Sequence, residues 1–398
     1  MRIEDKLSAR TQFMHANVTR EILKVVGQPG MISLAGGIPA PESFPIDIIR
    51  DLTNEVLDEF GPAALQYDQT EGFTPLRMAL MDYMPTRGVV NVNLDTLNIF
   101  SGSQSTLDLI SKVLITPGDT IAIEAPSYLG AISAFNAYQP TYVSIATDEN
   151  GMIPEALEET LKTQTIKFIY LVPTFQNPTG RTLSLERRKR VAELLQQYDV
   201  LLVEDDPYSA LRYSGEALPP IQQFAPDHVI YSSTFSKILS PGLRLGFCVA
   251  PAPLARWLAI AKQGSDLHTQ TLGQAIAALY LRGGYLTDHL PNIIALYRPR
   301  LESMLNALAN YMPEGFTWSH PEGGMFLWLA GPEGLDTDVL YQECVARGVA
   351  FVPGRYFYYD YSQGLNTMRL NFTMVSPAVV DKAVKILAET AQDTLITD

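Results

Sequence analysis

Short apolar segments alternate with segments of helical periodicity through the middle of the chain, and this alternation limits the fold more than any other feature. Spacings of three and four residues join Leu107, Ile110 and Leu114, and helical patterns also cover Tyr128–Tyr138 and Leu185–Tyr198. The predicted strands are Leu97–Phe100, Thr120–Glu124, Lys167–Val172, Val200–Glu204, Val229–Ser232 and Leu243–Ala250. Strands that alternate with helices are typical of a mostly parallel sheet. We therefore predict an α/β fold whose large domain has helices on both faces of such a sheet.

The pattern changes after residue 285, where a smaller α+β unit is predicted. Its helices are Leu290–Met312 and Pro377–Glu389, and its strands are Thr317–Pro321, Met325–Trp328 and Met368–Phe372. The first 45 residues are punctuated by Gly and Pro and predict a short helix followed by an extended arm. We therefore expect an N-terminal arm (1–45) that packs with the small domain and the substrate site, a large domain (46–285) and a small C-terminal domain (286–398).

The charge and composition exclude several classes of protein. Asp plus Glu number 43 against 29 for Lys plus Arg, so the net charge is −14, and such an acidic chain repels nucleic acids. The two cysteines make no disulfide framework, and the five histidines have no metal-binding spacing. The first residues are charged and contain no apolar stretch, so we expect no secretory signal there, and no apolar run reaches the roughly 18 residues that span a membrane. We therefore expect a cytoplasmic protein without a metal, a membrane or a nucleic acid as partner.

Polar clusters directly follow four of the predicted strands. Their members are Ser103 and Gln104, then Tyr128, then Asn177, and then Asp205 and Tyr208. In α/β folds, ligands bind beyond the carboxyl ends of the strands. Because these strand ends meet at one edge of the sheet, the clusters indicate a single binding site.

One segment, Tyr231–Gly246, holds a lone lysine among Ser and Thr hydroxyls. Its apolar flanks indicate that Lys237 is held out of bulk water, which lowers the pKa of an amine and lets it condense with an aldehyde. The hydroxyls and Arg244, seven positions further on, suit a phosphate dianion. An amine for an aldehyde beside a cradle for a phosphate describes pyridoxal 5'-phosphate (PLP). Taken alone, the segment is equally a surface loop with a solvated lysine.

The other strand ends supply the remaining groups that PLP requires. A buried carboxylate at Asp205 would keep the pyridinium nitrogen protonated, so that the ring accepts electrons. Asn177 and Tyr208 could donate to the phenolate oxygen, and Tyr128 offers a flat face for stacking. The helix that begins near Ser103 would direct backbone N–H groups at the phosphate. Singly these residues fit a helix cap, a turn or the core, but together they indicate one cofactor site.

Specific motifs run through nearly the whole chain. They are Ser-Gly-Ser-Gln (101–104), Glu-Ala-Pro-Ser-Tyr (124–128), Gln-Asn-Pro-Thr-Gly (176–180), Glu-Asp-Asp-Pro-Tyr (204–208), Thr-Phe-Ser-Lys (234–237), Pro-Gly-Leu-Arg (241–244) and Met-Arg-Leu-Asn-Phe (368–372). With these motifs the sequence resembles the class I/II PLP-dependent aminotransferases of fold type I. Segments Thr19–Leu23, Leu34–Pro39 and Gly323–Phe326 resemble the branch of 2-aminoadipate, kynurenine and other broad-specificity aminotransferases.

The resemblance implies a role for each matching position. Lys237 would hold the cofactor covalently and move the α-proton of the substrate, and Asp205 would pair with the pyridinium. Tyr67 would reach the phosphate of the neighbouring subunit, which implies a homodimer with shared active sites. The phosphate ligands within one chain would be Ser103, Gln104, Thr234, Ser236 and Arg244, with Thr234 standing where the family usually has Ser.

Substrate recognition is implied by the same resemblance. Arg369 matches the arginine that clamps the α-carboxylate, assisted by Asn177 and the backbone of Gly37. Arg20 resembles an arginine that meets a distal carboxylate, but a solvated helix residue is an equal alternative. His268 is expected near the site.

The implied activity is a ping-pong transfer of an amino group between an α-amino acid and a 2-oxo acid. The amino acid would be 2-aminoadipate, an aromatic or a branched-chain one, and the oxo acid would be 2-oxoglutarate. These small molecules and a second subunit are the expected partners. The alternatives are another PLP fold type I activity, namely a β-lyase, racemase or decarboxylase, and a non-catalytic PLP-binding regulator domain.

Overall fold

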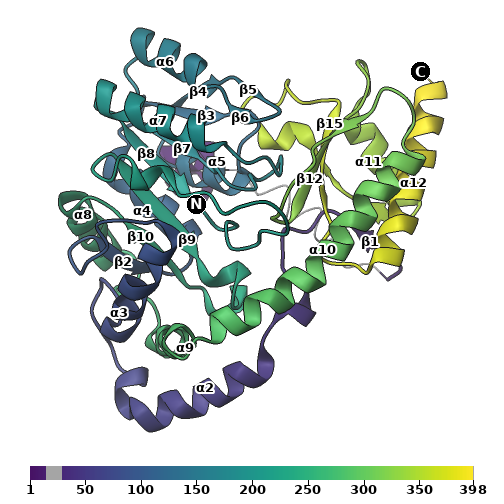
Figure 1. Cartoon of the computed structure of the whole chain (residues 1–398). Helices are drawn as coiled ribbons and strands as arrows, with labels where there is room; N and C mark the ends of the chain where they lie inside the picture. The colour runs from purple at the N-terminus through teal and green to yellow at the C-terminus, as the bar shows by residue number, and fades with distance from the viewer. Residues whose placement is uncertain (15–28, 398) are drawn as a thin grey trace.

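A seven-stranded sheet forms the centre of the structure, a computed structural model that describes residues 1–14 and 29–397 (Figure 1). In spatial order its strands are β2 (Leu97–Phe100), β10 (Gly246–Val249), β9 (Val229–Thr234), β8 (Leu201–Asp205), β7 (Phe168–Leu171), β3 (Thr120–Glu124) and β4 (Thr141–Ile145). Neighbouring strands are parallel except at β10, which is antiparallel to both β2 and β9. The predicted α/β fold class is confirmed.

Helices cover both faces of this sheet, which is why most residues of its strands are buried. The helices are α2 (Ile46–Glu59), α3 (Thr74–Tyr83), α4 (Ser103–Leu114), α5 (Leu129–Asn136), α6 (Pro154–Thr163), α7 (Leu185–Tyr198), α8 (Ala252–Gln263) and α9 (Thr271–Arg282). Phe168 of β7 belongs to the same core cluster as Leu107 of α4. The next residue, Ile169, points to the opposite face and belongs to the cluster of Val191 in α7.

A second, antiparallel sheet lies in the C-terminal part of the chain. Its strands, in order, are β11 (Thr317–Trp318), β12 (Phe326–Ala330), β15 (Thr367–Asn371) and β14 (Val352–Pro353). Helices α10 (Tyr285–Tyr311), α11 (Thr337–Ala346) and α12 (Pro377–Thr397) accompany it, and α10 runs from the side of α9 to the side of α12 (Figure 1). Helix α10 begins five residues before the predicted start because Pro291 does not break it.

The part of the N-terminal arm around β1 joins this second unit, whereas the guanidinium carbon of Arg10 lies 6.0 Å from the ring centroid of Tyr138 in the large one. Strand β1 (Ile32–Ser33) pairs in parallel with β13 (Val349–Ala350). Residues 1–14 contain two short 3-10 helices, η1 (Glu4–Lys6) and η2 (Ala9–Phe13), and η3 (Pro41–Ser43) precedes α2. Arg20 lies outside the described residues. The backbone N–H of Asn371, at the end of β15, also donates to the carbonyl of Leu34 over 2.7 Å, so the arm reaches the C-terminal sheet just before Gly37 enters the cavity at the strand ends of the large one.

The other elements are short. They are η4 (Gly61–Leu65), η5 (Met84–Arg87), β5 (Thr147–Asp148), β6 (Gly151–Met152), η6 (Ile221–Gln223), η7 (Phe235–Lys237), η8 (Pro241–Leu243) and η9 (Gly354–Phe357). The strand predicted from Leu243 begins only at Gly246, because η8 ends in a left-handed Arg244 with φ of 51°.

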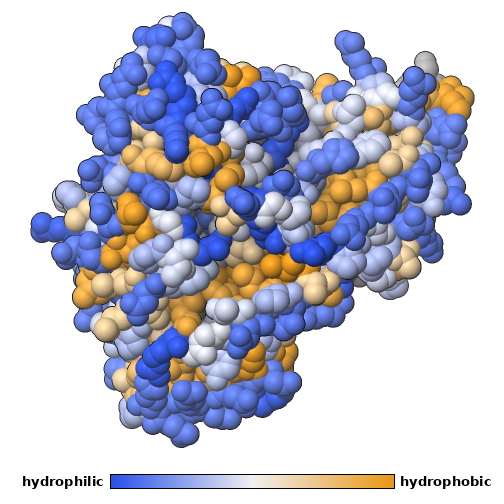
Figure 2. Space-filling view, in the orientation of Figure 1, coloured by the Kyte–Doolittle hydropathy of each residue, from blue (hydrophilic) through white to orange (hydrophobic). Residues whose placement is uncertain are grey.

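Hydrophilic residues cover the outer side of α6 and α7, whereas hydrophobic residues gather nearer the middle of the same face (Figure 2). None of the helices in residues 1–14 and 29–397 is long and apolar enough to cross a membrane.

Candidate active site

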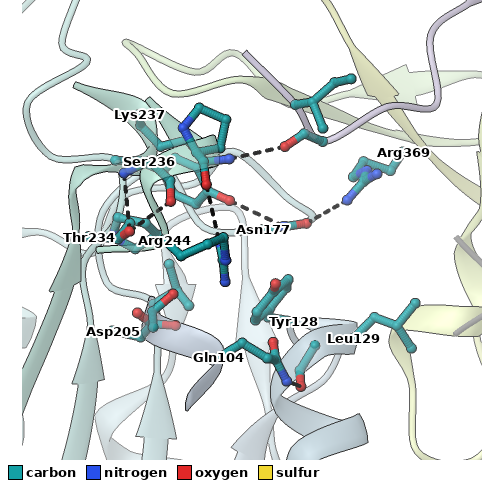
Figure 3. Close-up of a pocket in the computed structure, with 18 residues that line it drawn as sticks. Gln104, Tyr128, Leu129, Asn177, Asp205, Thr234, Ser236, Lys237, Arg244 and Arg369 are labelled. Atoms are coloured by element: carbon teal, nitrogen blue, oxygen red, sulfur yellow. Dashed lines mark hydrogen bonds between the residues drawn. The ribbon is translucent and has the colours of Figure 1, made fainter. Parts of the chain in front are cut away.

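One cavity of about 260 Å³ lies at the carboxyl ends of the parallel strands (Figure 3). The N-terminal arm and β15 close its other side. Twelve residues that the sequence singles out line it: Gly37, Ser103, Gln104, Tyr128, Asn177, Asp205, Tyr208, Thr234, Ser236, Lys237, Arg244 and Arg369. The fold thus brings together side chains that are up to 332 positions apart in the sequence, from 37 to 369.

Lys237 lies in η7, directly after the central strand β9. Its Nζ donates a hydrogen bond to the carbonyl oxygen of Gly37 over 3.1 Å (Figure 3). Burial, together with the positive charges of Arg369 and Arg244, lowers the pKa of this amine to about 8. About a tenth of the amine is therefore uncharged at pH 7, and the uncharged form is the nucleophile.

Asp205 ends strand β8 and is 2% exposed. Its Oδ2 accepts a hydrogen bond of 2.8 Å from the hydroxyl of Tyr170, but Oδ1 has no partner within the described residues. Burial raises the pKa of Asp205 to about 7; the bond from Tyr170 opposes this shift and the charge of Asp206 adds to it. A buried carboxylate oxygen without a donor is costly, so this atom fits a ligand that brings an N–H group.

Asn177 connects the cofactor side of the cavity to Arg369. Its Nδ2 donates to the hydroxyl of Tyr208 over 3.3 Å, and its Oδ1 accepts from Nη1 of Arg369 over 2.9 Å. Arg369 Nη2 also donates to the carbonyl of Ala35 over 2.7 Å, while its Nε lacks a partner among the described residues. The buried guanidinium of Arg369 is thus held in place by two hydrogen bonds, and its Nε–H remains available to a ligand.

Two aromatic rings flank the Arg369 guanidinium. Its central carbon lies 4.3 Å from the ring centroid of Phe326 and 4.9 Å from that of Phe357. Burial lowers the pKa of Arg369 to about 10. Cation–π contact offsets part of the cost of burying this charge. The site therefore holds a fixed cation that suits a carboxylate.

The remaining groups form a cradle for an anion. Ser103 and Gln104 are the first residues of α4, whose backbone N–H groups have no acceptor within the helix. The Thr234 hydroxyl accepts from the backbone N–H of Ser236 over 3.1 Å. Arg244 approaches the turn before α4 so closely that a Cβ added to Gly102 would lie 2.5 Å from its Nη2.

Side chains of three predicted residues have other surroundings. The Gln104 amide donates to the carbonyl of Gly130 over 2.7 Å, so its side chain is already engaged. Tyr67 is 77% exposed and lines a separate hollow with His268, whose ring centroid is 5.6 Å away. In one chain, therefore, neither Tyr67 nor His268 lines the cavity around Lys237.

Several residues that line the cavity or contact its lining side chains were not predicted from the sequence. Tyr170 places a hydroxyl group inside an otherwise apolar predicted strand, and this unusual position could have indicated a functional residue. Ile38 and Leu129 line the cavity as apolar neighbours of predicted residues. Phe357, in contrast, belongs to a short 3-10 helix far from any motif, and no local pattern points to it.

The residues present fit PLP. The unpaired Oδ1 of Asp205 suits a protonated ring nitrogen, the buried amine of Lys237 suits an aldehyde, and the start of α4 with Arg244 suits a phosphate. No group of His, Cys, Asp and Glu that could hold a metal ion occurs within the part of the chain that the structure describes.

Comparisons with known proteins agree with this chemistry. The family model described as aminotransferase class I and II matches residues 30–387. Aromatic-amino-acid aminotransferase 1 of Thermococcus litoralis is 48% identical over 98% of this chain and 95% of its own length. The 2-aminoadipate transaminase of Thermus thermophilus is 37% identical over 96% of this chain and 95% of its own.

A solved structure is equally similar in shape. The crystal structure of Pyrococcus horikoshii kynurenine aminotransferase in complex with PMP has a TM-score of 0.95 at 45% identity, covering 99% of this chain and 98% of that one. PMP is the amino form of PLP, the group that the cavity fits. The chain therefore belongs to the class I and II aminotransferases and is a PLP-dependent aminotransferase.

Proposed function

We propose that this enzyme transfers the amino group of an aromatic α-amino acid to 2-oxoglutarate in a ping-pong cycle, with 2-aminoadipate and branched-chain amino acids as further donors. The observation that carries the proposal is a single cavity with the amine of Lys237, the unpaired oxygen of Asp205 and the guanidinium of Arg369. PLP and an α-amino acid together need these three groups. The names of the relatives, which include aromatic, 2-aminoadipate and kynurenine aminotransferases, support the donor class.

When bound, PLP supplies an electron-accepting ring that stabilises the charge left on the α-carbon after its proton is removed. Lys237 would hold the cofactor covalently and, once released by the substrate amine, would accept the α-proton at Nζ and deliver it to the cofactor rather than back to the α-carbon. Its pKa of about 8 suits both halves of that task near neutral pH. Asp205 would hold a proton on the ring nitrogen, and the hydrogen bond from Tyr170 would orient its carboxylate.

The other cofactor contacts follow from the arrangement of the cavity. Asn177 and Tyr208 would donate to the phenolate oxygen, and Tyr128 would stack on the ring. The phosphate would be bound by Ser103, Gln104, Ser236, Arg244 and Thr234. We assign the contacts of Gln104 to its backbone N–H, since its amide already bonds to Gly130. Thr234 would act mainly by holding Ser236, to which its hydroxyl is bonded.

Arg369 would clamp the substrate α-carboxylate, with Asn177 holding one of its nitrogens. The backbone carbonyl of Gly37 already accepts from Lys237, so this residue would lie against both the base and the substrate. Orienting the carboxylate in this way selects removal of the α-proton over loss of CO₂. Ile38 and Leu129 offer apolar contact to the substrate side chain, which favours aromatic and branched-chain donors.

2-Oxoglutarate and 2-aminoadipate also carry a distal carboxylate. The cations that line the described cavity are Lys237, Arg244 and Arg369, and each has a role in the scheme above. We therefore keep the prediction that Arg20, outside the described residues, meets the distal carboxylate. A solvated Arg20 is the alternative, and the Arg20→Gln variant separates them by its Michaelis constants for 2-oxoglutarate and an apolar oxo acid.

We also propose a homodimer of cytoplasmic enzyme in which Tyr67 completes the partner's phosphate site. The large exposed fraction of Tyr67, outside the cavity of its own chain, supports this assignment. Residues 46–285 and 286–398 would form the two domains, with the arm (1–45) lying against the small one. The β1–β13 pairing supports that place for the arm, and the free, buried cysteines suit a reducing compartment.

A panel of amino donors assayed with 2-oxoglutarate tests the proposal. We expect glutamate to form together with the oxo acid of an aromatic donor, with parallel double-reciprocal plots. Racemised amino acid, CO₂ or pyruvate with ammonia as the main product would instead support the racemase, decarboxylase or β-lyase alternative. An enzyme that binds PLP at Lys237 but turns over none of these donors would contradict the proposed substrates while leaving the cofactor assignment intact.

A further inference from the structure

Lys262 is a charged side chain outside the cavity that has no place in the scheme above. It lies in the last turn of α8, is 0% exposed, and its Nζ is 2.6 Å from Oδ1 of Asp266. The ammonium also lies 5.9 Å from the ring centroid of Phe100, at the end of strand β2. Burying an ammonium group is costly even when it is paired, so this arrangement calls for a function.

The carboxylate of Asp266 has a second partner, in the turn that leads into the active site. Its Oδ2 accepts a hydrogen bond of 2.6 Å from the hydroxyl of Ser101. The same hydroxyl is 3.3 Å from that of the buried Thr269. Both carboxylate oxygens of Asp266 are thus engaged, Oδ1 by the ammonium of Lys262 and Oδ2 by the hydroxyl of Ser101, the residue that follows β2.

The Ser101–Ser103 turn determines the geometry of the anion cradle. The carbonyl of Ser101 accepts from Nη2 of Arg244 at 3.5 Å, so it helps hold that guanidinium. The next residue, Gly102, has φ of +86° and is followed at once by α4. Gly246 of β10 packs so closely under the turn that an added Cβ would lie 2.7 Å from the backbone nitrogen of Ser103. A small displacement of Ser101 would therefore move both the start of α4 and Arg244.

We propose that Asp266, paired with Lys262, is a positioning residue of the phosphate subsite, which holds the Ser101–Ser103 turn and thereby Arg244 and the start of α4. The inference rests on the proposed function, because it takes the start of α4 and Arg244 as the phosphate ligands. Asp266 itself does not line the cavity. The alternative is an ordinary ion pair between residues four apart that stabilises only the end of α8.

The two explanations differ in what they predict for ligands with and without a phosphate. We would titrate the cofactor-free, full-length enzyme with PLP and with pyridoxal, and follow the absorbance of the lysine adduct. Asp266→Asn and Lys262→Met should weaken PLP roughly tenfold or more, as expected for a lost charge-assisted hydrogen bond, and should leave pyridoxal within about twofold. The matched control is Lys162→Met, which removes another ion pair between residues four apart, with Glu158 in α6.

Equal weakening of both ligands, or of neither, would overturn the positioning role. If the Asp266 and Lys262 variants do not fold, Ser101→Ala decides, since it removes the hydroxyl donor and leaves the ion pair in place; it should again weaken PLP more than pyridoxal. Failure of the wild-type enzyme to form an adduct at Lys237 would refute the proposed function itself. A wild-type adduct without the loss of phosphate discrimination in the variants would refute only this inference.

Discussion

At the scale of single residues, the cavity holds three ionisable side chains whose pKa values are shifted toward neutrality. The pKa of Lys237 is lowered to about 8, that of Asp205 is raised to about 7, and that of Arg369 is lowered to about 10. Burial is the largest cause in each case, since it disfavours the charged form. Burial therefore makes the charged forms of these three groups costly, and a bound ligand of opposite charge would lower that cost.

The Asp205→Asn variant tests whether Asp205 destabilises the cofactor-free protein. Because the folded pKa lies above the unfolded one, wild-type stability should fall as pH rises from about 4 to about 7. Above that range the variant should be more stable, by about 4 kcal/mol at most, since one pKa unit corresponds to about 1.4 kcal/mol. Urea unfolding of both cofactor-free proteins at pH 5 and pH 8 measures this difference.

The same variant should bind PLP but turn over amino acids far more slowly.

Glu124 and Glu204, whose pKa values burial also raises to about 7, make the stability of both proteins depend on pH in the same way. Only the difference in unfolding free energy between wild type and Asp205→Asn is therefore informative. A difference that does not grow between pH 5 and pH 8 would show that Asp205 carries no such cost.

Arg369→Gln should raise the Michaelis constant for amino acids by about 10- to 100-fold, because the substrate carboxylate loses its charge-assisted hydrogen bonds. The affinity for PLP should remain within about twofold, since Arg369 touches Asn177 and Ala35 rather than the phosphate cradle. Steady-state kinetics and a PLP titration check both statements. Arg50→Gln, on the exposed side of α2, is the control. A Michaelis constant equal to that of the control would remove the carboxylate role from Arg369.

At the scale of elements, the turn between β2 and α4 allows no side chain at Gly102 without displacing Arg244. Gly102→Ala combines an unfavourable φ of +86° with a contact of 2.5 Å to Arg244 Nη2. Gly118→Ala is a matched control, since φ there is +92° and no atom lies within 4 Å of the added Cβ. Both variants should lose stability, but only Gly102→Ala should weaken PLP, by roughly tenfold or more. A PLP titration that finds the two variants alike would contradict the cradle geometry.

The sequence was sufficient to predict six of the seven strands of the large sheet, all but β4, and most of the cavity. The strands β2, β3 and β7 lie where short, mostly apolar segments predict them, because a strand covered on both faces is buried along most of its length. The polar residues that follow those strands had to lie together once the strands were parallel. Gly37 and Arg369, by contrast, could be placed in the site only through the resemblance to a family.

The sequence was not sufficient where a position depends on contacts from distant segments. Strand β10 is antiparallel within a parallel sheet, and no local pattern distinguishes it from its neighbours. The aromatic ring of Phe357 meets Arg369 only because η9 packs beside β15. Likewise, the bond from Ser101 to Asp266 joins residues 165 positions apart.

At the scale of the whole molecule, the exposed position of Tyr67 makes a prediction about assembly. If Tyr67 serves the partner's site, Lys237→Ala chains mixed with Tyr67→Ala chains should form hybrid dimers with one intact site. Random pairing would then restore about a quarter of the wild-type sites. The activity of the remixed sample, compared with each variant alone, measures this effect.

A second mixture provides the control. Lys237 and Arg244 line the same cavity of one chain, so mixing Lys237→Ala with Arg244→Gln chains should restore nothing. Restoration in both mixtures, or in neither, would contradict a shared site at Tyr67. Sedimentation of the wild-type protein should show a dimer at assay concentrations.

If the amine of Lys237 binds the PLP aldehyde, the bond between them can be trapped by chemical reduction and located in the sequence. The purified enzyme is reduced with borohydride in the presence of PLP, digested, and searched by mass spectrometry for the phosphopyridoxyl group. We predict the group on Lys237, and its loss in the Lys237→Ala variant. A label that persists in that variant on another lysine, or a wild-type enzyme that takes up no label, would contradict the account.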